Sequence, residues 1–230
     1  MTHSSQLDQT DQLFTALAEQ LKVPLLQIAR LSELSSELAL PRISAISEHA
    51  LRLVDAYAQA HSQDQTKLQL EPITTSAVLY DVAMQLEPFA RQWEFTIEID
   101  SQGKAVPIMA HRESLKTMLT LLGASLIEAT AEDSDAPRHL VFGAHRSVGG
   151  TVVGAFSNHL AVTQRALQLT RELHGRATQA VPLLGLAGGA GLAIADQLSE
   201  QMDAPLRAYK HRTLAGIGSL LTPSRQLQFV

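Results

Sequence analysis

The stretch AEQLKVPLLQI, residues 18–28, lies within a leucine stripe that decides how the N-terminal part of the chain folds. Apolar residues recur at spacings of three and four, namely Leu13, Leu17, Leu21, Leu25, Ile28, Leu31, Leu34 and Leu38. This spacing puts them on one face of a helix, which we expect to cover residues 8–38. Pro24 lies inside the pattern and should kink the helix, because proline lacks a backbone donor.

A second helix is predicted after a break at Pro41. Its apolar stripe begins at Ile43 and Ile46 and continues through Leu53 and Tyr57 to about residue 60. Two helices joined by a short connection form an antiparallel hairpin. Because two helices cannot bury both of their apolar faces alone, we expect a second copy of the chain to complete a four-helix bundle. We assign residues 1–62 to this hairpin and the polar residues 63–72 to a linker.

The remainder of the chain, residues 73–230, is predicted to be an α+β domain. Helical periodicity covers residues 75–93, 113–129 and 191–201; strand patterns cover 95–99, 106–109, 140–145, 151–156, 206–210 and 217–221. Residues 157–187 show no regular pattern. Because several strands follow one another as hairpins among helices, we expect a mixed sheet covered by helices.

Composition excludes several classes of function. The 230 residues include no Cys, which removes disulfides, thiolate metal sites and Cys nucleophiles. The net charge of -5 argues against nucleic-acid and anionic-membrane binding. The N-terminus has no basic region before an apolar run, and glycines interrupt the apolar residues 180–195. We therefore expect no signal peptide, no membrane span and a cytoplasmic location.

The order of these segments resembles the core of a sensor histidine kinase. Five segments carry the resemblance: 18–28 (the phosphoacceptor motif), 67–100 (the entry to the ATP-binding domain), 109–130 (the Asn-rich helix), 185–206 (the Gly-rich turn and its helix) and 213–223 (the last strand). Together they span about residues 10–223. The resemblance implies a dimerisation and phosphotransfer hairpin, then an α/β sandwich of the gyrase, Hsp90, histidine kinase and MutL ATPase type.

The residues that carry this family's chemistry are mostly replaced. Glu19 stands where the resemblance puts the phosphoacceptor His, and Gln20 replaces the acidic residue beside it. A carboxylate cannot form the phosphohistidine linkage. The two Asn positions correspond to Leu121 and Ser125, and Leu offers Mg²⁺ no oxygen. The Asp-x-Gly-x-Gly motif is replaced by SNHLA at residues 157–161. We therefore expect no catalytic residue and no metal site.

Two sets of residues remain as binding candidates. Gly188, Gly189 and Gly191 precede a helix, where backbone donors can bind phosphate, and Ser125 would join them in a residual nucleotide site. The same glycines equally suit a tight turn and close helix–sheet packing. The second set follows Glu19 on the helix face that docks a receiver domain in the family: Val23, Leu26, Gln27 and Arg30. These residues equally suit the inside of a helix bundle.

The histidines offer weaker candidates. His49 is either a displaced phosphoacceptor or a residue at the edge of the bundle. His139 and His145 share one face of a strand, but no carboxylate accompanies them at a metal-binding spacing. His111 lies at a helix start, and His174 lies in the segment that corresponds to the ATP lid.

Three hypotheses follow. The first is a catalytically degenerate, histidine-kinase-like homodimer that needs no cofactor and binds a receiver domain or another kinase. The alternative is an active phosphotransferase or kinase that uses a non-standard acceptor such as His49 and binds ATP with Mg²⁺. The third is that the former nucleotide pocket, made more apolar by Leu121, holds another small molecule or is filled by side chains.

Overall fold

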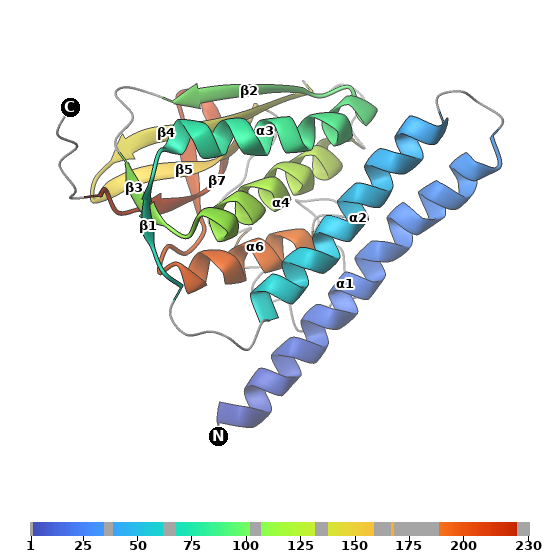
Figure 1. Ribbon diagram of the computed structural model, residues 1–230, viewed down its shortest axis with the longest axis horizontal. Helices are drawn as coiled ribbons and strands as arrows, with labels where there is room; N and C mark the ends of the chain where they lie inside the picture. The colour runs from blue at the N-terminus through green and yellow to red at the C-terminus, as the bar shows by residue number, and fades with distance from the viewer. Residues whose placement is uncertain are drawn as a thin grey trace.

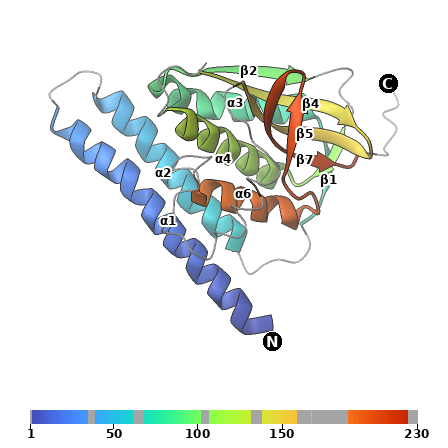
Figure 2. The ribbon, with the colours of Figure 1, turned by 180° about the vertical axis from the view of Figure 1, so that it is seen from behind.

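The computed structural model describes residues 2–34, 39–61, 68–101, 107–131, 138–158, 167 and 189–224. Its elements form three layers: a sheet, three helices packed against it, and a helical hairpin on the far side of those helices (Figure 1). Figure 2, the view from behind, shows α2 beside α6 and the N-terminal end of α1 projecting past the domain. None of the described helices is long and apolar enough to cross a membrane.

The hairpin consists of α1 (Thr2–Ser32) and α2 (Ala39–His61). α1 begins earlier and ends earlier than the helix predicted over residues 8–38, and it continues through Pro24. The predicted break between the helices at Pro41 is wrong, because Pro41 lies in the first turn of α2. Proline is tolerated there because the first backbone N–H groups of a helix have no partner within it.

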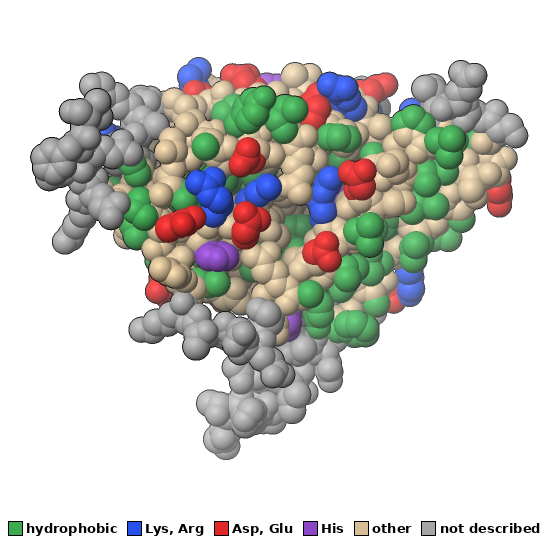
Figure 3. Space-filling view, viewed as in Figure 1, with side chains coloured by type: hydrophobic (Ala, Val, Ile, Leu, Met, Phe, Trp, Pro, Cys, Tyr) green, Lys and Arg blue, Asp and Glu red, His purple; other side chains and the backbone are tan. Residues whose placement is uncertain are grey.

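One face of the hairpin is covered by the rest of the same chain. Leu17 of α1 and Leu53, Ala56 and Ala60 of α2 belong to the main hydrophobic core of the α+β domain. Other members of the predicted stripes remain in solvent; the large exposed apolar side chains of the hairpin are Phe14, Val23, Leu25, Leu26, Leu34, Leu40, Leu51 and Val54. Figure 3 shows apolar side chains spread over the hairpin surface. The α+β domain thus buries part of the apolar hairpin surface that, from the sequence, we expect a second hairpin to bury.

The predicted mixed sheet is confirmed. Its strand order is β2-β4-β5-β7-β6, with β2 (Thr96–Ser101), β4 (His139–Ser147), β5 (Gly150–Ser157), β7 (Leu214–Leu221) and β6 (Arg207–His211). β2 and β4 are parallel and the other neighbours are antiparallel. A separate pair joins β1 (Glu71–Ile73) to β3 (Ile108–Ala110). β1 was not predicted, and it begins inside the expected linker.

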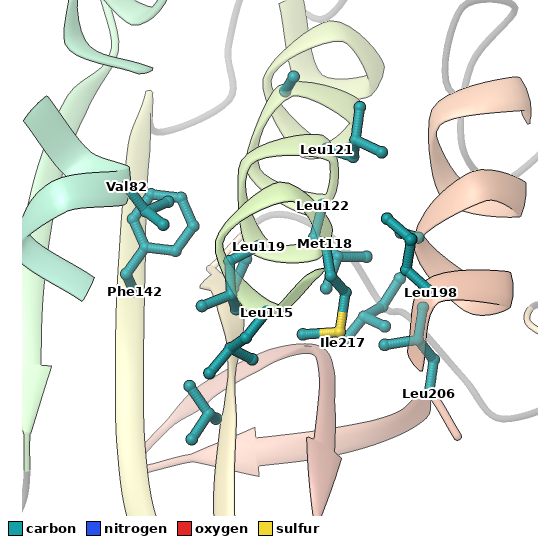
Figure 4. Packing of buried hydrophobic residues seen from close by; sticks show 14 of the residues in the cluster. Val82, Leu115, Met118, Leu119, Leu121, Leu122, Phe142, Leu198, Leu206 and Ile217 are labelled. Atoms are coloured by element: carbon teal, nitrogen blue, oxygen red, sulfur yellow. The ribbon is translucent and has the colours of Figure 1, made fainter. Parts of the chain in front are cut away.

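Three helices cover the inner face of the sheet: α3 (Thr75–Gln92), α4 (Arg112–Ala131) and α6 (Gly189–Gln201). α4 lies in the middle, with Leu115, Met118, Leu119 and Leu122 fully buried between the sheet and the neighbouring helices (Figure 4). α4 approaches β4 closely at Gly123, where an added β-carbon would lie 2.5 Å from Phe142 Cζ. This central helix therefore holds the sheet on one side and α6 on the other.

The outer face of the sheet carries a small cluster built around His211. His211 Nε2 lies 2.9 Å from Asp100 Oδ2, and its Nδ1 lies 2.9 Å from His145 Nδ1. The His211 ring stacks on Phe156, with 5.0 Å between ring centroids. It also covers Gly143, where an added β-carbon would lie 2.9 Å from the ring. The pKa of His145 is lowered below its ordinary value of 6.5, mainly by burial and to a lesser extent by the charge of the nearby His211.

The lowered pKa of His145 predicts a loss of stability in acid. Above pH 6.5 the group is neutral in both states; as the pH falls below that value, the unfolded chain binds the proton more readily than the folded one. Stability should therefore fall through this range and continue to fall until the folded-state pKa is passed.

Urea unfolding at about pH 7.5 and about pH 5.5 measures this loss of stability. The His145→Gln variant should lose less stability between these two pH values than the parent protein. Arg146→Gln, a change at an exposed neighbour, should behave like the parent. The assignment would be refuted if His145→Gln lost as much stability between the two pH values as the parent does.

Candidate functional site

The N-terminus of α6 is capped by a side chain from the hairpin. The first backbone N–H groups of a helix have no partner within it, and they attract anions. Here Gln20 Oε1 accepts hydrogen bonds from the backbone N–H groups of Ala190, at 2.8 Å, and Gly191, at 3.1 Å. Gln20 is only 8% exposed. A neutral amide oxygen from α1 therefore occupies the donors that could otherwise hold a phosphate.

The other end of the Gln20 amide leads to a buried ionisable pair. Gln20 Nε2 lies 3.5 Å from Glu128 Oε2, and Glu128 Oε1 lies 3.1 Å from His49 Nε2. His49 is 4% exposed and stacks on Phe89, with ring centroids 4.4 Å apart. Its Nε2 is near enough to Glu128 for an ion pair, yet it lies outside the angles of a hydrogen bond. Residues of α1, α2, α4 and α6 thus meet in one buried polar network.

The residual nucleotide candidates meet beneath this network. Ser125 of α4 packs directly against Gly191, where an added β-carbon would lie 2.9 Å from Ser125 Oγ. The same β-carbon would lie 3.7 Å from Leu53 Cδ2, on α2. Gly189 is the first residue of α6, and Gly188 lies outside the described residues. The structure therefore brings Ser125 and Gly191 together, in contact with the hairpin.

The resemblance predicts further nucleotide-site positions at Leu121 and at residues 157–161, and only some of them are described. Leu121 is 2% exposed and lies on the side of α4 that faces α6 (Figure 4). Ser157 is buried and Asn158 is exposed, and residues 159–161 are not described. Among the described residues, no group of three His, Asp or Glu side chains is arranged to hold a metal ion.

Glu19 and three of the four docking candidates are exposed on α1, whereas Gln20 is buried. Glu19 is exposed and forms an ion pair with Lys22. Val23 is 40% exposed and Leu26 is 60% exposed, Arg30 is exposed and Gln27 is half-buried. Apolar and cationic side chains on α1 thus remain accessible next to Glu19, which the sequence places at the predicted phosphoacceptor position.

A second set of polar contacts fixes the C-terminal end of α2. Gln201 Nε2 of α6 donates to the backbone carbonyl of Ala60 at 2.8 Å, and Gln197 Nε2 lies 3.4 Å from the same oxygen. Gln59 donates to Ser114 Oγ at 3.2 Å and accepts from Thr117 Oγ1 at 3.0 Å. α6 therefore receives a cap from α1 and supplies one to α2.

The remaining histidine candidates have structural partners. His111 caps the start of α4, since its Nδ1 accepts from the Ser114 backbone N–H at 3.3 Å. His139 Nε2 lies 3.1 Å from Glu98 Oε2, and His145 contacts His211 instead of His139. His174 lies outside the described residues.

Sequence reasoning missed the roles of Gln20 and Glu128. A signal was present for Gln20, because it follows Leu17 by three residues and so lies on the apolar face of its helix. A polar residue on that face needs a buried partner. Nothing in the spacing identified the partner, which is 170 residues away at Ala190.

Removal of the Gln20 side chain should destabilise the folded chain. Gln20→Ala leaves two buried backbone donors without a partner, which typically costs about 1–3 kcal/mol of unfolding free energy. Urea unfolding measures the loss, and the neighbouring Glu19→Ala, whose parent side chain is exposed, should change stability by less than ~0.5 kcal/mol. Equal losses in the two variants would contradict the capping role.

The sequence matches no protein-family model and no curated protein, but the fold is similar to solved histidine kinase structures. Histidine kinase AdeS of Acinetobacter baumannii has a TM-score of 0.53 and 12% identity over 90% of this chain and 98% of AdeS. Histidine kinase ThkA in complex with response regulator protein TrrA has a TM-score of 0.59 and 15% identity over 98% of this chain and 66% of ThkA.

Full-length ShkA in complex with AMPPNP has a TM-score of 0.53 and 17% identity, and the match covers 93% of this chain and 47% of ShkA. The chain thus spans about half of ShkA and about two thirds of the ThkA chain. At these identities the likeness shows the fold, and function has to be argued from the site. The chain has the α+β fold of histidine kinase ATPase-type domains, preceded by a helical hairpin.

Proposed function

We propose that this chain is a catalytically degenerate, histidine-kinase-like binding module that acts in two-component type signalling. One observation carries the proposal: Gln20 of the hairpin occupies the backbone donors at the start of α6. Two replacements support it, an exposed carboxylate at Glu19 where a phosphoacceptor His is expected, and the buried Leu121 in place of a Mg²⁺ ligand. We propose no cofactor for this function.

The proposed partner is a receiver domain or another kinase. The exposed apolar residues Val23 and Leu26, together with the cationic Arg30, offer a surface that can bury area against a folded partner. Among the similar structures, ThkA is seen in complex with its response regulator. A chain that keeps such a surface without phosphotransfer chemistry would bind a receiver without phosphorylating it.

The alternative is a phosphotransferase that uses His49. The carboxylate of Glu128, 3.1 Å from His49 Nε2, is the kind of neighbour that activates an imidazole. Against this reading, His49 is 4% exposed, and Gln20 holds the donors that a phosphate would need. An active enzyme would have to separate the hairpin from the domain before either group became accessible.

Nucleotide binding separates the two proposals. Isothermal titration of the whole chain with ATP, with and without Mg²⁺, should give no saturable heat at micromolar nucleotide concentrations. Incubation with labelled ATP should leave the protein unlabelled. Mg²⁺-dependent micromolar binding would overturn the degenerate reading, and label that disappears in His49→Ala would establish the alternative.

The exposed apolar face of the hairpin predicts a homodimer. Light scattering at micromolar concentration should give about twice the chain mass of 24.9 kDa. Leu25→Glu and Leu51→Glu should shift the protein towards the monomer, because both side chains are more than half exposed on the hairpin. Tyr80→Glu is the matched control, since Tyr80 is similarly exposed on α3. A monomeric parent protein would contradict this prediction.

A further inference from the structure

A cavity of about 260 Å³ lies where the end of α1, the start of α2 and the end of α3 meet. α1 lines it with Gln27, Arg30 and Leu31, and the last two follow Gln27 at the helical spacings of three and four residues. α2 contributes Arg42 and Ile46, one turn apart. The helices thus direct one face of the hairpin towards the C-terminal end of α3.

The wall of the cavity that belongs to α3 is held firmly. Trp93 closes α3, and its backbone carbonyl accepts a hydrogen bond from Arg138 Nη1 at 3.0 Å. The neighbouring Gln92 donates its side-chain amide to the carbonyl of Pro88 at 3.3 Å. Trp93 also buries its indole Nε1–H without a hydrogen-bond partner among the described residues. The half-buried side chain of Trp93 therefore forms one side of the cavity.

The charge of the lining has one sign. Arg30 and Arg42 are both exposed, and neither forms an ion pair with any residue in the part of the chain that the structure describes. Among the described residues that line the cavity, none carries a carboxylate, and the other polar side-chain groups are the amides of Gln27 and Gln92 and the indole N–H of Trp93. Other arginines at comparable exposure have partners; Arg91, for example, pairs with Glu87 at 2.9 Å. Two guanidinium groups are thus free to bind an anion.

The apolar part of the lining limits which anion fits. Leu31, Ile46 and Trp93 supply hydrocarbon and aromatic surface beside the two arginines. A planar carboxylate matches the paired donors of a guanidinium, and an apolar tail would cover the hydrophobic wall. A doubly charged phosphate would lose more hydration beside the same wall and gain nothing from it. The cavity is smaller than the ~300–1,000 Å³ pockets of drug-sized ligands, so the ligand must be small.

We infer that this cavity is an effector site for a small monocarboxylate with an apolar body. The ligand would contact α1, α2 and α3 together, and so it would tie the hairpin to the domain. Two of its contacts, Gln27 and Arg30, also belong to the proposed docking surface. The inference does not depend on the proposed function, because it rests on the cavity and its charge alone.

Trp93 provides a direct readout, since it is the single tryptophan of the chain. Octanoate titrated into the whole protein should change the Trp93 emission saturably, and calorimetry on the same samples should give the same affinity. Octanamide, which has the same tail without the charge, should bind at least about tenfold more weakly, the usual order of a charge-assisted hydrogen bond. Inorganic phosphate should also bind more weakly than octanoate.

Arg30→Gln and Arg42→Gln should each weaken octanoate binding about tenfold by the same reasoning. Arg91→Gln is the matched control, because Arg91 is an exposed arginine of α3 outside the cavity lining, and it should bind like the parent. Circular dichroism should show that all three variants are folded, since all three side chains are exposed. The inference is overturned by the absence of saturable heat, by equal binding of octanamide or phosphate, or by an equal loss in Arg91→Gln.

Discussion

The two hydrogen bonds from the start of α6 to Gln20 are the interaction on which the arrangement of this chain depends. They join the hairpin to the domain at a helix N-terminus, the kind of position at which backbone N–H groups can bind an anion. Because Gln20 is neutral, it satisfies the donors without adding a charge next to the half-buried Glu128. A carboxylate at this position would interact better with the helix dipole but would lie against another carboxylate.

Much of the fold could be predicted from local patterns. The period of the apolar residues identified the hairpin, α3, α4 and α6. The alternation over residues 95–99 identified β2, and two apolar runs on either side of a Gly-containing turn identified β4 and β5. The errors fell where local signals compete with tertiary structure. Pro41 reads as a break but lies in a first helical turn, and the three-residue β1 carries too little pattern to be seen without its partner β3. Both depend on neighbours that no window of sequence contains.

The candidate site was less predictable than the fold. The proposed replacements at Glu19 and Leu121 come from residue identity at positions matched to the family pattern, so they could be proposed without a structure and stay predictions. The pairing of Gln20 with Ala190, and of His49 with Glu128, joins segments from different parts of the chain. Side-chain chemistry indicates that a buried amide or imidazole needs a partner, but only the packing of the helices selects which one.

The reciprocal caps around α6 determine how the hairpin can move. If the hairpin tilts away from the domain, the N–H groups of Ala190 and Gly191 lose Gln20, and the carbonyl of Ala60 loses Gln201. A small tilt breaks all of these hydrogen bonds at the same time, before water can replace them. A partial displacement of the hairpin therefore costs nearly as much free energy as its full separation from the domain. The hairpin should therefore behave as a switch with two discrete positions, docked and released, instead of a lever that tilts by degrees. A partner that binds only the released position would have to supply the whole free energy of undocking at once.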